Sequence, residues 1–331
     1  MPITPYPLRL DPYLSRPIWG GRKLATRYGK GGTSSESLGE SWEIWEGDVV
    51  QNGAWTGRIL SDLTTELGPA LLGTDLHGEA SARFPLLIKL IDATEQLSIQ
   101  VHPNDKQAQA LEHEPFGKTE AWYILDAAPD AKLVYGLAHE MSHDELRERA
   151  ASGSIERDLS YLAVRPGDVV LVPAGTIHAI GAGIVLYEIQ QTSKTTYRLY
   201  DWNRRGPDGQ MRELHLDKAV AVALRSPGAN GRQRPRELTQ DSGVRRWELV
   251  RCPYFVLERA ALSDPWTYRQ DGRSFAGLTC TKGSFHLHAL GGSWPAEPVR
   301  EGGSILLPAS LAECAIMPDG QDVEVLIAHL P

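Results

Sequence analysis

A short sequence pattern occurs twice in this chain and constrains its fold more than any other feature. Val164–Ala174 lines up without gaps with Val299–Ala309, and the residue numbers differ by 135 throughout. In both copies a turn containing glycine feeds an apolar strand that stops at Pro-Ala. The repeat predicts two related units built mainly from β-strands.

The chain is also rich in residues that make turns. Its 331 residues include 32 Gly and 22 Pro, which favours many short strands over long helices. Such strand density is typical of a double-sheet jelly roll. The segment Ser226–Glu237 gathers Pro, Gly and Arg and is the best candidate for a linker. We therefore expect a first domain over residues 1–238, carrying the helical segments, and a second over residues 239–331.

Charge and apolar patterning limit the partners of the chain. The formal net charge of −8 argues against a nucleic-acid partner, but a local cationic pocket for an anionic substrate is compatible with it. No apolar run approaches the ~20 residues that span a bilayer. The first residues lack a basic segment followed by an apolar one, and three cysteines without metal-ligand spacing suit a reducing compartment. These observations predict a soluble, cytoplasmic protein.

The stretch Leu97–Asp105 is the first candidate for chemistry. It has the pattern of a strand that ends in a Pro-Asn-Asp turn. Because strand side chains alternate between faces, Ser98, Gln100 and His102 share one face. An amide oxygen and an imidazole two residues apart can bind one metal ion. Taken alone, such a stretch is more often a polar strand edge with one satisfied histidine.

Two further residues complete a possible metal site. Glu120 opens the next strand pattern, and His178 follows an apolar strand and a Pro-Gly turn. With Gln100 and His102 they form a plausible zinc set that leaves a coordination position for substrate or water. The repeat lacks this chemistry, because Glu313 falls where His178 stands. The pair His286 and His288 has no acidic residue at a matching spacing, so we expect the second unit to lack metal.

Two other strand patterns carry expectations about side-chain direction. Phe84–Ile91 is an apolar run interrupted by Lys89, as in a strand buried on both faces. A lysine there is costly unless it reaches an anion or solvent. In Ser41–Glu46 strict alternation predicts Trp42 and Ile44 on one face.

Several ordered runs together resemble one family. They are Trp19–Gly21, Gly39–Ile44, Phe84–Lys89, Leu97–Asp105, Gly117–Trp122, Val172–Gly181, Tyr187–Gln191 and Thr195–Trp202. In these runs the chain resembles the type I mannose-6-phosphate isomerases (phosphomannose isomerases) of the short bacterial form, which belong to the cupin superfamily. The resemblance is close over roughly residues 15–225 and weak beyond them.

The resemblance implies a fold, an activity and a cofactor. It implies a mainly β fold of two cupin barrels (double-stranded jelly rolls) with a few short helices. It implies interconversion of D-mannose 6-phosphate and D-fructose 6-phosphate through a metal-stabilised enediolate. One Zn²⁺ per chain would be held by Gln100, His102, Glu120 and His178, in a monomer or homodimer.

Further residues are assigned roles at the same site. Arg198 matches the active-site arginine of the family, and its guanidinium can serve an enediolate or a phosphate; the alternative is a surface arginine paired with Asp201. Glu188 is the candidate carboxylate for proton transfer, unless it is only a strand partner of Arg198. Lys118, Lys89 and Ser98 are candidates for substrate contacts.

Two residues near the matching runs differ from those usual in the family. Trp45 stands where a small polar residue is usual, and Lys194 stands where an acidic residue is usual. The change at Lys194 adds positive charge near Arg198 if its loop folds inward, which bears on sugar specificity.

Three alternatives remain open at this point. One is a zinc-dependent cupin isomerase or epimerase that acts on another sugar. Another is a non-catalytic sugar-binding cupin, against which a retained Arg198 and Glu188 beside the ligand set argue. The third is a structural protein without metal.

Overall fold

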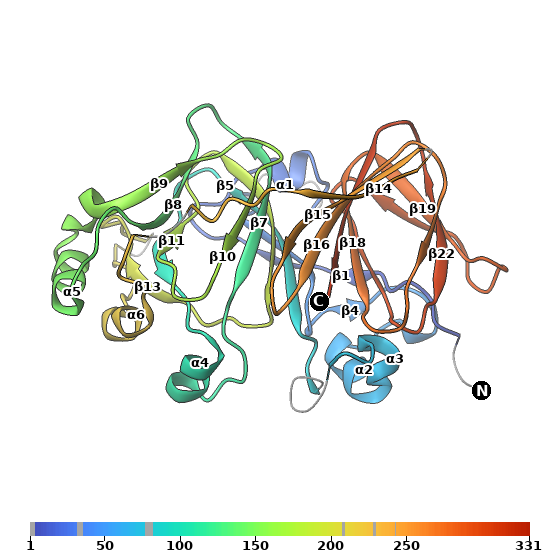
Figure 1. Cartoon of the computed structure of the whole chain (residues 1–331), viewed down its shortest axis with the longest axis horizontal. Coiled ribbons are helices and arrows are strands. Elements are labelled where there is room, and N and C mark those ends of the chain that lie inside the picture. The colour runs from blue at the N-terminus through green and yellow to red at the C-terminus, as the bar shows by residue number, and fades with distance from the viewer. Residues whose placement is uncertain (1–3, 32–35, 77–81, 207–208, 228–229, 242) are drawn as a thin grey trace.

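The structure is a computed structural model that describes residues 4–331, except 32–35, 77–81, 207–208, 228–229 and 242. The chain is mainly β with a few short helices, and Figure 1 shows two β-rich halves side by side along its long axis. The helices are α1 (Lys23–Thr26), α2 (Leu60–Leu67), α3 (Pro69–Leu72), α4 (Asp105–Glu112), α5 (His143–Ser152) and α6 (Leu216–Val222), with 3₁₀ turns at Gly53–Trp55 and Ser154–Asp158.

The N-terminal half contains two antiparallel sheets. The larger has the order β10-β7-β12-β5-β3-β2 and the smaller the order β13-β6-β11-β8-β9. The strands of the larger sheet are β2 (Tyr13–Ser15), β3 (Glu40–Ile44), β5 (Leu86–Ala93), β7 (Glu120–Ala127), β10 (Val169–Val172) and β12 (Ile184–Gln191). Those of the smaller are β6 (Ile99–Val101), β8 (Lys132–Leu137), β9 (Leu159–Ala163), β11 (His178–Ala179) and β13 (Tyr197–Tyr200).

The C-terminal half also contains two sheets, with the orders β14-β15-β16-β23-β18-β21 and β17-β22-β19-β20. The larger consists of β14 (Arg236–Asp241), β15 (Val244–Arg251), β16 (Val256–Leu262), β18 (Ala276–Lys282), β21 (Ser304–Leu307) and β23 (Val323–His329). The smaller consists of β17 (Trp266–Arg269), β19 (Ser284–His288), β20 (Glu297–Arg300) and β22 (Glu313–Pro318). A two-stranded ribbon pairs β1 (Leu10–Asp11) with β4 (Val49–Val50).

The repeat predicted from the sequence is visible in the sheet order. Its two apolar strands are β10 and β21, and each lies at one edge of the larger sheet of its half. Counted from these edges, the first four strands have the orders β10-β7-β12-β5 and β21-β18-β23-β16, and the two orders correspond strand by strand. His178 begins β11 and Glu313 begins β22, so the predicted correspondence of these two residues also holds.

The two halves share one apolar core. A cluster of buried side chains runs from Leu8 near the start of the chain, through β5 and β12, to Leu330. Leu8 and Leu306 exchange two backbone hydrogen bonds of 2.7 and 3.0 Å, which attach the N-terminal segment to β21. The helices α2 and α3 lie beneath the C-terminal half in Figure 1, where the N–H of Ala309 donates to Leu71 at 2.9 Å.

Two expectations about strands are wrong. A β-bulge interrupts the pairing of β3 with β5, so that Trp42 lies opposite Lys89 while Ile44 lies opposite Ile88. Trp42 and Ile44 therefore point to opposite faces, because one extra residue reverses the alternation. The strand at 197–200 does not pair with β12: it pairs with β6, and Arg198 lies opposite Gln100. The alternative in which Glu188 is a strand partner of Arg198 is thus excluded.

Other expectations stand in part. The helical segments expected in the first domain include α2 and α3, which are separated at Gly68, and residues 77–81 lie outside the described part of the chain. The predicted linker 226–237 includes residues 228 and 229, which are also outside it; the N–H of Gln233 donates to Val169 of β10 at 2.8 Å. The domain boundary at 238/239 stays a prediction.

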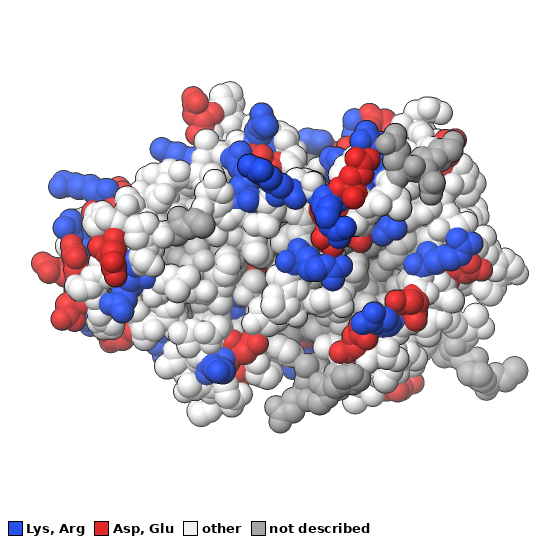
Figure 2. All heavy atoms as spheres, viewed as in Figure 1, with Lys and Arg blue, Asp and Glu red and all other residues white. Residues whose placement is uncertain are grey.

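The described surface carries both signs of charge. On the face drawn in Figure 2 acidic and basic side chains are interspersed. Among the arginines of β14 and β15, Arg236 and Arg251 pair with Glu248 at 3.1 and 2.9 Å. Within the described residues, no helix is both long enough and apolar enough to cross a membrane.

Candidate metal centre and its pocket

A row of functional side chains crosses one face of the larger N-terminal sheet. Directly paired residues of neighbouring strands share a face. Trp42 lies opposite Lys89, Lys89 opposite Glu188, and Glu188 opposite Trp122. Strand register alone therefore places a cation, a carboxylate and two indoles side by side.

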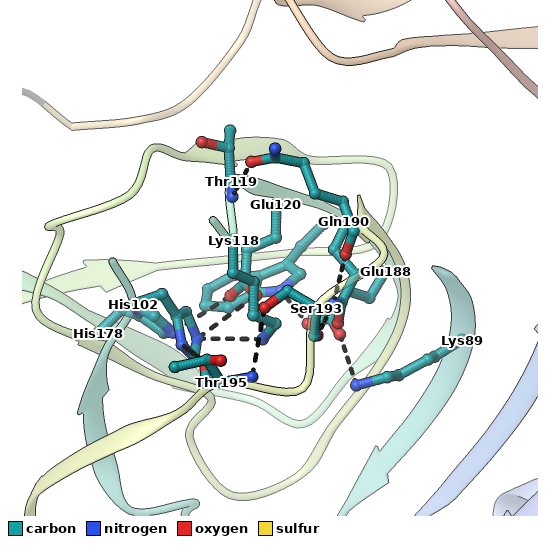
Figure 3. Close-up of polar contacts among 12 residues, drawn as sticks. Lys89, His102, Lys118, Thr119, Glu120, His178, Glu188, Gln190, Ser193 and Thr195 are labelled. Atoms are coloured by element: carbon teal, nitrogen blue, oxygen red, sulfur yellow. Dashed lines mark hydrogen bonds and ion pairs between the residues drawn. The ribbon is translucent and has the colours of Figure 1, made fainter. Parts of the chain in front are cut away.

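Three buried residues form the candidate metal centre. One atom each of His102, Glu120 and His178 lies within 4.8 Å of the others. Nε2 of His178 is 3.2 Å from Oε1 of Glu120, and Nε2 of His102 is 3.6 Å from Oε2 of Glu120. All three side chains are buried, and Figure 3 shows them converging. Gln100 lies directly opposite His178 in the β6–β11 pairing, next to the group.

Backbone carbonyls orient both imidazoles. Nδ1 of His102 is 2.9 Å from the carbonyl oxygen of Thr195, and Nδ1 of His178 is 2.9 Å from that of Thr176. A carbonyl oxygen only accepts, so each Nδ1 carries the proton and each Nε2 presents a lone pair. Burial, reinforced by the charge of Lys118, lowers the pKa of His102 well below its ordinary value, which keeps that ring neutral. Neutral imidazole is the form that binds metal.

The unsatisfied atoms of the group fit a divalent cation. Nε2 of His178 and both carboxylate oxygens of Glu120 are buried without a hydrogen bond of good geometry. Burial alone would raise the pKa of Glu120, but the charge of Lys118 lowers it well below its ordinary value. Nζ of Lys118 lies 2.6 Å from Oε2 of Glu120 and 3.0 Å from Nε2 of His102. The group thus offers a carboxylate and two imidazole lone pairs, a donor set typical of zinc.

A pocket of about 240 Å³ opens beside this group. Its polar lining includes all three residues predicted to contact substrate and both predicted to act in catalysis. The lining side chains are Glu40, Lys89, Ser98, Gln100, Lys118, Glu188, Thr196, Arg198 and Arg212, with Pro17, Trp19, Ile91, Leu97 and Ile180. Four of these carry positive charge, so the pocket is cationic on an acidic protein.

Lys89 and Glu188 form a buried ion pair in this pocket. Nζ of Lys89 is 3.1 Å from Oε1 of Glu188, and it is also 3.7 Å from Glu40. Burial would lower the pKa of Lys89, but the charges of Glu188, Glu40 and Glu120 raise it above its ordinary value. Nε1 of Trp122 donates to Oε2 of Glu188 at 2.8 Å, so both carboxylate oxygens are held. Of the two expectations for Lys89, contact with an anion is therefore the one observed.

Arg198 reaches the pocket from β13. Its Nη1 donates to the carbonyl of Glu213 at 2.8 Å, whereas its Nε is buried without a hydrogen-bond partner. Asp201 is bound by Arg204 and Arg212, at 2.5 Å in each case, so the alternative that pairs Arg198 with Asp201 is wrong. Burial and the charge of Arg212 lower the pKa of Arg198, yet a guanidinium remains charged at neutral pH.

Some site residues were not predicted from the sequence. Arg212 and Glu40 line the pocket, and Thr195 supplies the carbonyl for His102. Glu40 and Thr195 lie within recognised runs but carry no chemical signal of their own. Arg212 lies in an irregular segment of ordinary polarity. In the second unit, His286 contacts Asp319 at 2.8 Å.

Comparison with known proteins places these features in one family. The family model "Phosphomannose isomerase type I, catalytic domain" matches residues 8–129. Mannose-6-phosphate isomerase ManA of Bacillus subtilis is 36% identical over 332 aligned residues, which cover 99% of this chain and 100% of that protein. A mannose-6-phosphate isomerase of Streptococcus mutans is 39% identical, over 78% of this chain and 79% of that protein.

Solved structures agree with these sequence matches. A crystal structure of mannose 6-phosphate isomerase from Bacillus subtilis has a TM-score of 0.87 at 33% identity and covers 98% of this chain and 99% of its own. The apo form of the Salmonella typhimurium enzyme is 16% identical, with a TM-score of 0.73 over 98% of this chain and 99% of its own. The second likeness shows the fold alone.

Proposed function

The chain belongs to the type I mannose-6-phosphate isomerase family, and we propose that it interconverts D-mannose 6-phosphate and D-fructose 6-phosphate in the cationic pocket. The reaction moves one proton between C1 and C2 and another between the two oxygens. Negative charge develops on oxygen along that path, so fixed positive groups stabilise it. A pocket with four cations next to a carboxylate suits both the substrate phosphate and this charge.

In this proposal one Zn²⁺ per chain is held by Gln100, His102, Glu120 and His178. The fit of the three buried groups, with the two Nε2 lone pairs directed by backbone carbonyls, supports it. Gln100 joins because its strand pairing places it opposite His178. Bound there, zinc would supply Lewis-acid polarisation of substrate oxygens.

The side chains of the pocket have separate roles. Glu188, held by Trp122 and Lys89, transfers the proton between the two carbons. Arg198 keeps one amino group on the carbonyl of Glu213 and directs the rest of its fork to the developing oxyanion. Lys118, Lys89 and Ser98 contact the sugar phosphate.

The proposal extends to the architecture and setting of the protein. Each half forms a cupin jelly roll, with the boundary at 238/239, and only the first binds metal. The corresponding strand orders of the two halves support this division. The chain acts in the cytoplasm as a monomer or homodimer on a small sugar phosphate, without nucleic-acid or membrane partners.

One observation carries the proposal more than any other. The buried His-Glu-His group and the pocket containing Arg198, Glu188 and Lys118 are contiguous, since Lys118 contacts both. A non-catalytic sugar-binding cupin would need the metal group but has no use for a carboxylate fixed by two partners. The alternative of an enzyme acting on another sugar is not favoured, because the relatives and the solved structure reported above are mannose-6-phosphate isomerases.

The direct test is a coupled assay of mannose 6-phosphate isomerisation with and without chelator, extended to Arg198→Lys. Lysine keeps the charge but loses the planar fork, so turnover should fall roughly a hundredfold, about 3 kcal/mol, the scale of one lost oxyanion donor. Zinc content should stay at wild-type level. A matched control is Arg205→Lys, because exposed Arg205 also donates to a backbone carbonyl, that of Gly209 at 2.8 Å.

The outcomes separate the candidate functions. If Arg198 serves only the phosphate, the Michaelis constant rises while turnover stays near wild type. If the wild-type protein binds the sugar phosphate tightly and never isomerises it, the sugar-binding alternative replaces the proposal. Turnover of a different phosphorylated sugar but not of mannose 6-phosphate would refute the proposal in favour of an enzyme acting on another sugar.

A further inference from the structure

Three aromatic rings form a cluster on the larger N-terminal sheet, next to the pocket. Trp42 and Trp45 make an edge contact with centroids 5.2 Å apart. Tyr13 of β2 lies 5.1 Å from Trp42 and 6.3 Å from Trp45. The bulge in β3 makes this possible, because it turns Trp42 to the face of Lys89, whose Nζ is 5.0 Å from the Trp42 ring.

Lys194 extends from a different part of the chain onto this cluster. Its Nζ lies 4.2 Å from the centroid of Trp45 and 5.7 Å from that of Trp42. A lysine ammonium within about 6 Å of an indole ring is attracted to its face. Trp45 and Lys194, the two departures from the usual family residues noted above, thus contact each other.

The segment that carries Lys194 also orients a metal-centre histidine. Residues 192–196 connect β12 to β13 and lie outside both strands. Thr195, the next residue, supplies the carbonyl that accepts from Nδ1 of His102 at 2.9 Å. On the other side of Lys194, the carbonyl of Ser193 accepts from Nε2 of Gln190 at 2.8 Å. Figure 3 shows Thr195 beside the histidines and Ser193 on the side of Gln190.

The two residues on either side of Lys194 therefore differ in how firmly their backbone is held. Ser193 is fixed by buried Gln190, which sits inside β12. Thr195 is half-buried, and its N–H makes only a 3.3 Å bond to Oγ of Ser193. The position of the Thr195 carbonyl then depends on how its neighbour Lys194 is anchored. The orientation of the His102 ring depends in turn on that carbonyl, because a hydrogen bond to Nδ1 fixes the direction of Nε2.

We propose that Lys194, clasped on the Trp42–Trp45 indoles, is a positioning residue that holds the Thr195 carbonyl in place and so sets the affinity of the His102, Glu120 and His178 centre for zinc. This inference rests on the metal set of the proposed function. The contact of Lys194 with the two indoles connects the 192–196 segment to β3. Through the backbone of Thr195, it links the aromatic cluster to the buried side chain of His102.

The test measures zinc affinity by competition with a chromophoric chelator, without sugar. Lys194→Met removes the charge and keeps the apolar stem, and Trp45→Ser removes the nearer ring. Each should weaken zinc binding roughly two- to fivefold, the factor that corresponds to an exposed cation–π contact. The double variant should be no weaker than the worse single variant, because both remove one interaction. Lys194→Arg should restore wild-type affinity.

The matched control is Lys132→Met. Lys132 makes the same type of contact, with its Nζ 4.3 Å from the ring centroid of Tyr161, on the β8–β9 side of the smaller sheet. Its loss should leave zinc affinity unchanged. Urea unfolding of all variants shows whether each remains folded.

Several results would overturn the inference. Wild-type zinc affinity in Lys194→Met, or an equal loss in Lys194→Arg and Lys132→Met, would show that the contact does not act on the centre. Wild-type protein that binds no zinc removes the metal set and the inference with it. Wild-type protein that binds zinc but does not isomerise mannose 6-phosphate refutes the proposed function, while the variant series still decides the inference.

Discussion

Replacing Lys89 with methionine should destabilise the protein strongly, because it leaves buried carboxylates without their cation. Lys89 is 8% exposed and Glu188 is 3% exposed. Removing one partner of a buried ion pair typically costs about 3–5 kcal/mol of unfolding free energy. Glu40, 3.7 Å from the ammonium, also loses its cation but keeps the hydrogen bond that Nε1 of Trp42 donates at 2.7 Å, so we expect a value within that range. Methionine fills the space of the lysine stem, so little of this loss reflects a cavity.

Replacing the other partner of the pair, Glu188, should cost less unfolding free energy. Glu188→Gln keeps an acceptor for Nε1 of Trp122, now 2.8 Å from the carboxylate, and leaves Lys89 near Glu40 and the Trp42 ring. We expect a loss of about 1–3 kcal/mol. At an effective dielectric constant near 20, two charges separated by the observed 3.1 Å attract by about 5 kcal/mol before desolvation. A double-mutant cycle should therefore give a coupling energy of about 2–3 kcal/mol.

The assay is urea unfolding followed by tryptophan fluorescence at fixed zinc concentration. The control is Lys23→Met, whose ammonium makes a shorter contact of 2.7 Å with Asp126 but is 46% exposed. An exposed pair is worth under about 1 kcal/mol. If Lys89→Met costs no more than Lys23→Met, burial does not determine the strength of this pair and the reasoning fails. Separately, Glu188→Gln should abolish isomerisation while remaining folded.

Three further outcomes are expected. His178→Ala should reduce zinc content, measured by elemental analysis, from about one per chain to near zero, whereas two zinc ions per wild-type chain would contradict a metal-free second half. Burial, together with the charges of Glu43 and Asp11, raises the pKa of Asp48 from 3.8 to about 8. Between those pH values the folded chain keeps a proton that the unfolded chain releases, so this group makes stability fall as pH rises, by up to about 1.4 kcal/mol per pH unit. Asp48→Asn should remove that component in urea unfolding at pH 5.5 and 8, and identical slopes for the two proteins would refute it. Limited proteolysis should cut first within residues 226–237, and early cutting inside β12 would contradict its burial.

The local parts of the site could be predicted from the sequence. Gln100, His102, Glu120 and His178 lie in or next to short strands whose signals are short-range, so their placement on β6, β7 and β11, with His102 directly after β6, was predictable. The apolar run around Lys89 predicted a strand buried on both faces, which the structure confirms. The repeat predicted matching strands in the two halves because its pattern preserves both turn and strand.

The parts that depend on long-range pairing could not be predicted in this way. The alternative that makes Glu188 a strand partner of Arg198 fails because β13 crosses to the smaller sheet and pairs with β6. The bulge in β3 is a property of two strands in register, and alternation within one strand does not reveal it. Arg212 reaches the pocket through such tertiary packing, with its guanidinium fixed by Asp201.

The attachment of Leu8 to Leu306 has a consequence for synthesis on the ribosome. The two residues that form this bridge are separated by almost the whole chain. At about 5–20 residues per second, the early segment waits roughly 15–60 s before its partner strand is made. The N-terminal half therefore emerges first, with the apolar side chains near Leu8 not yet covered by β21. Chaperones that shield nascent apolar segments would act during this interval, which ends when β21 is made and pairs with the segment at Leu8.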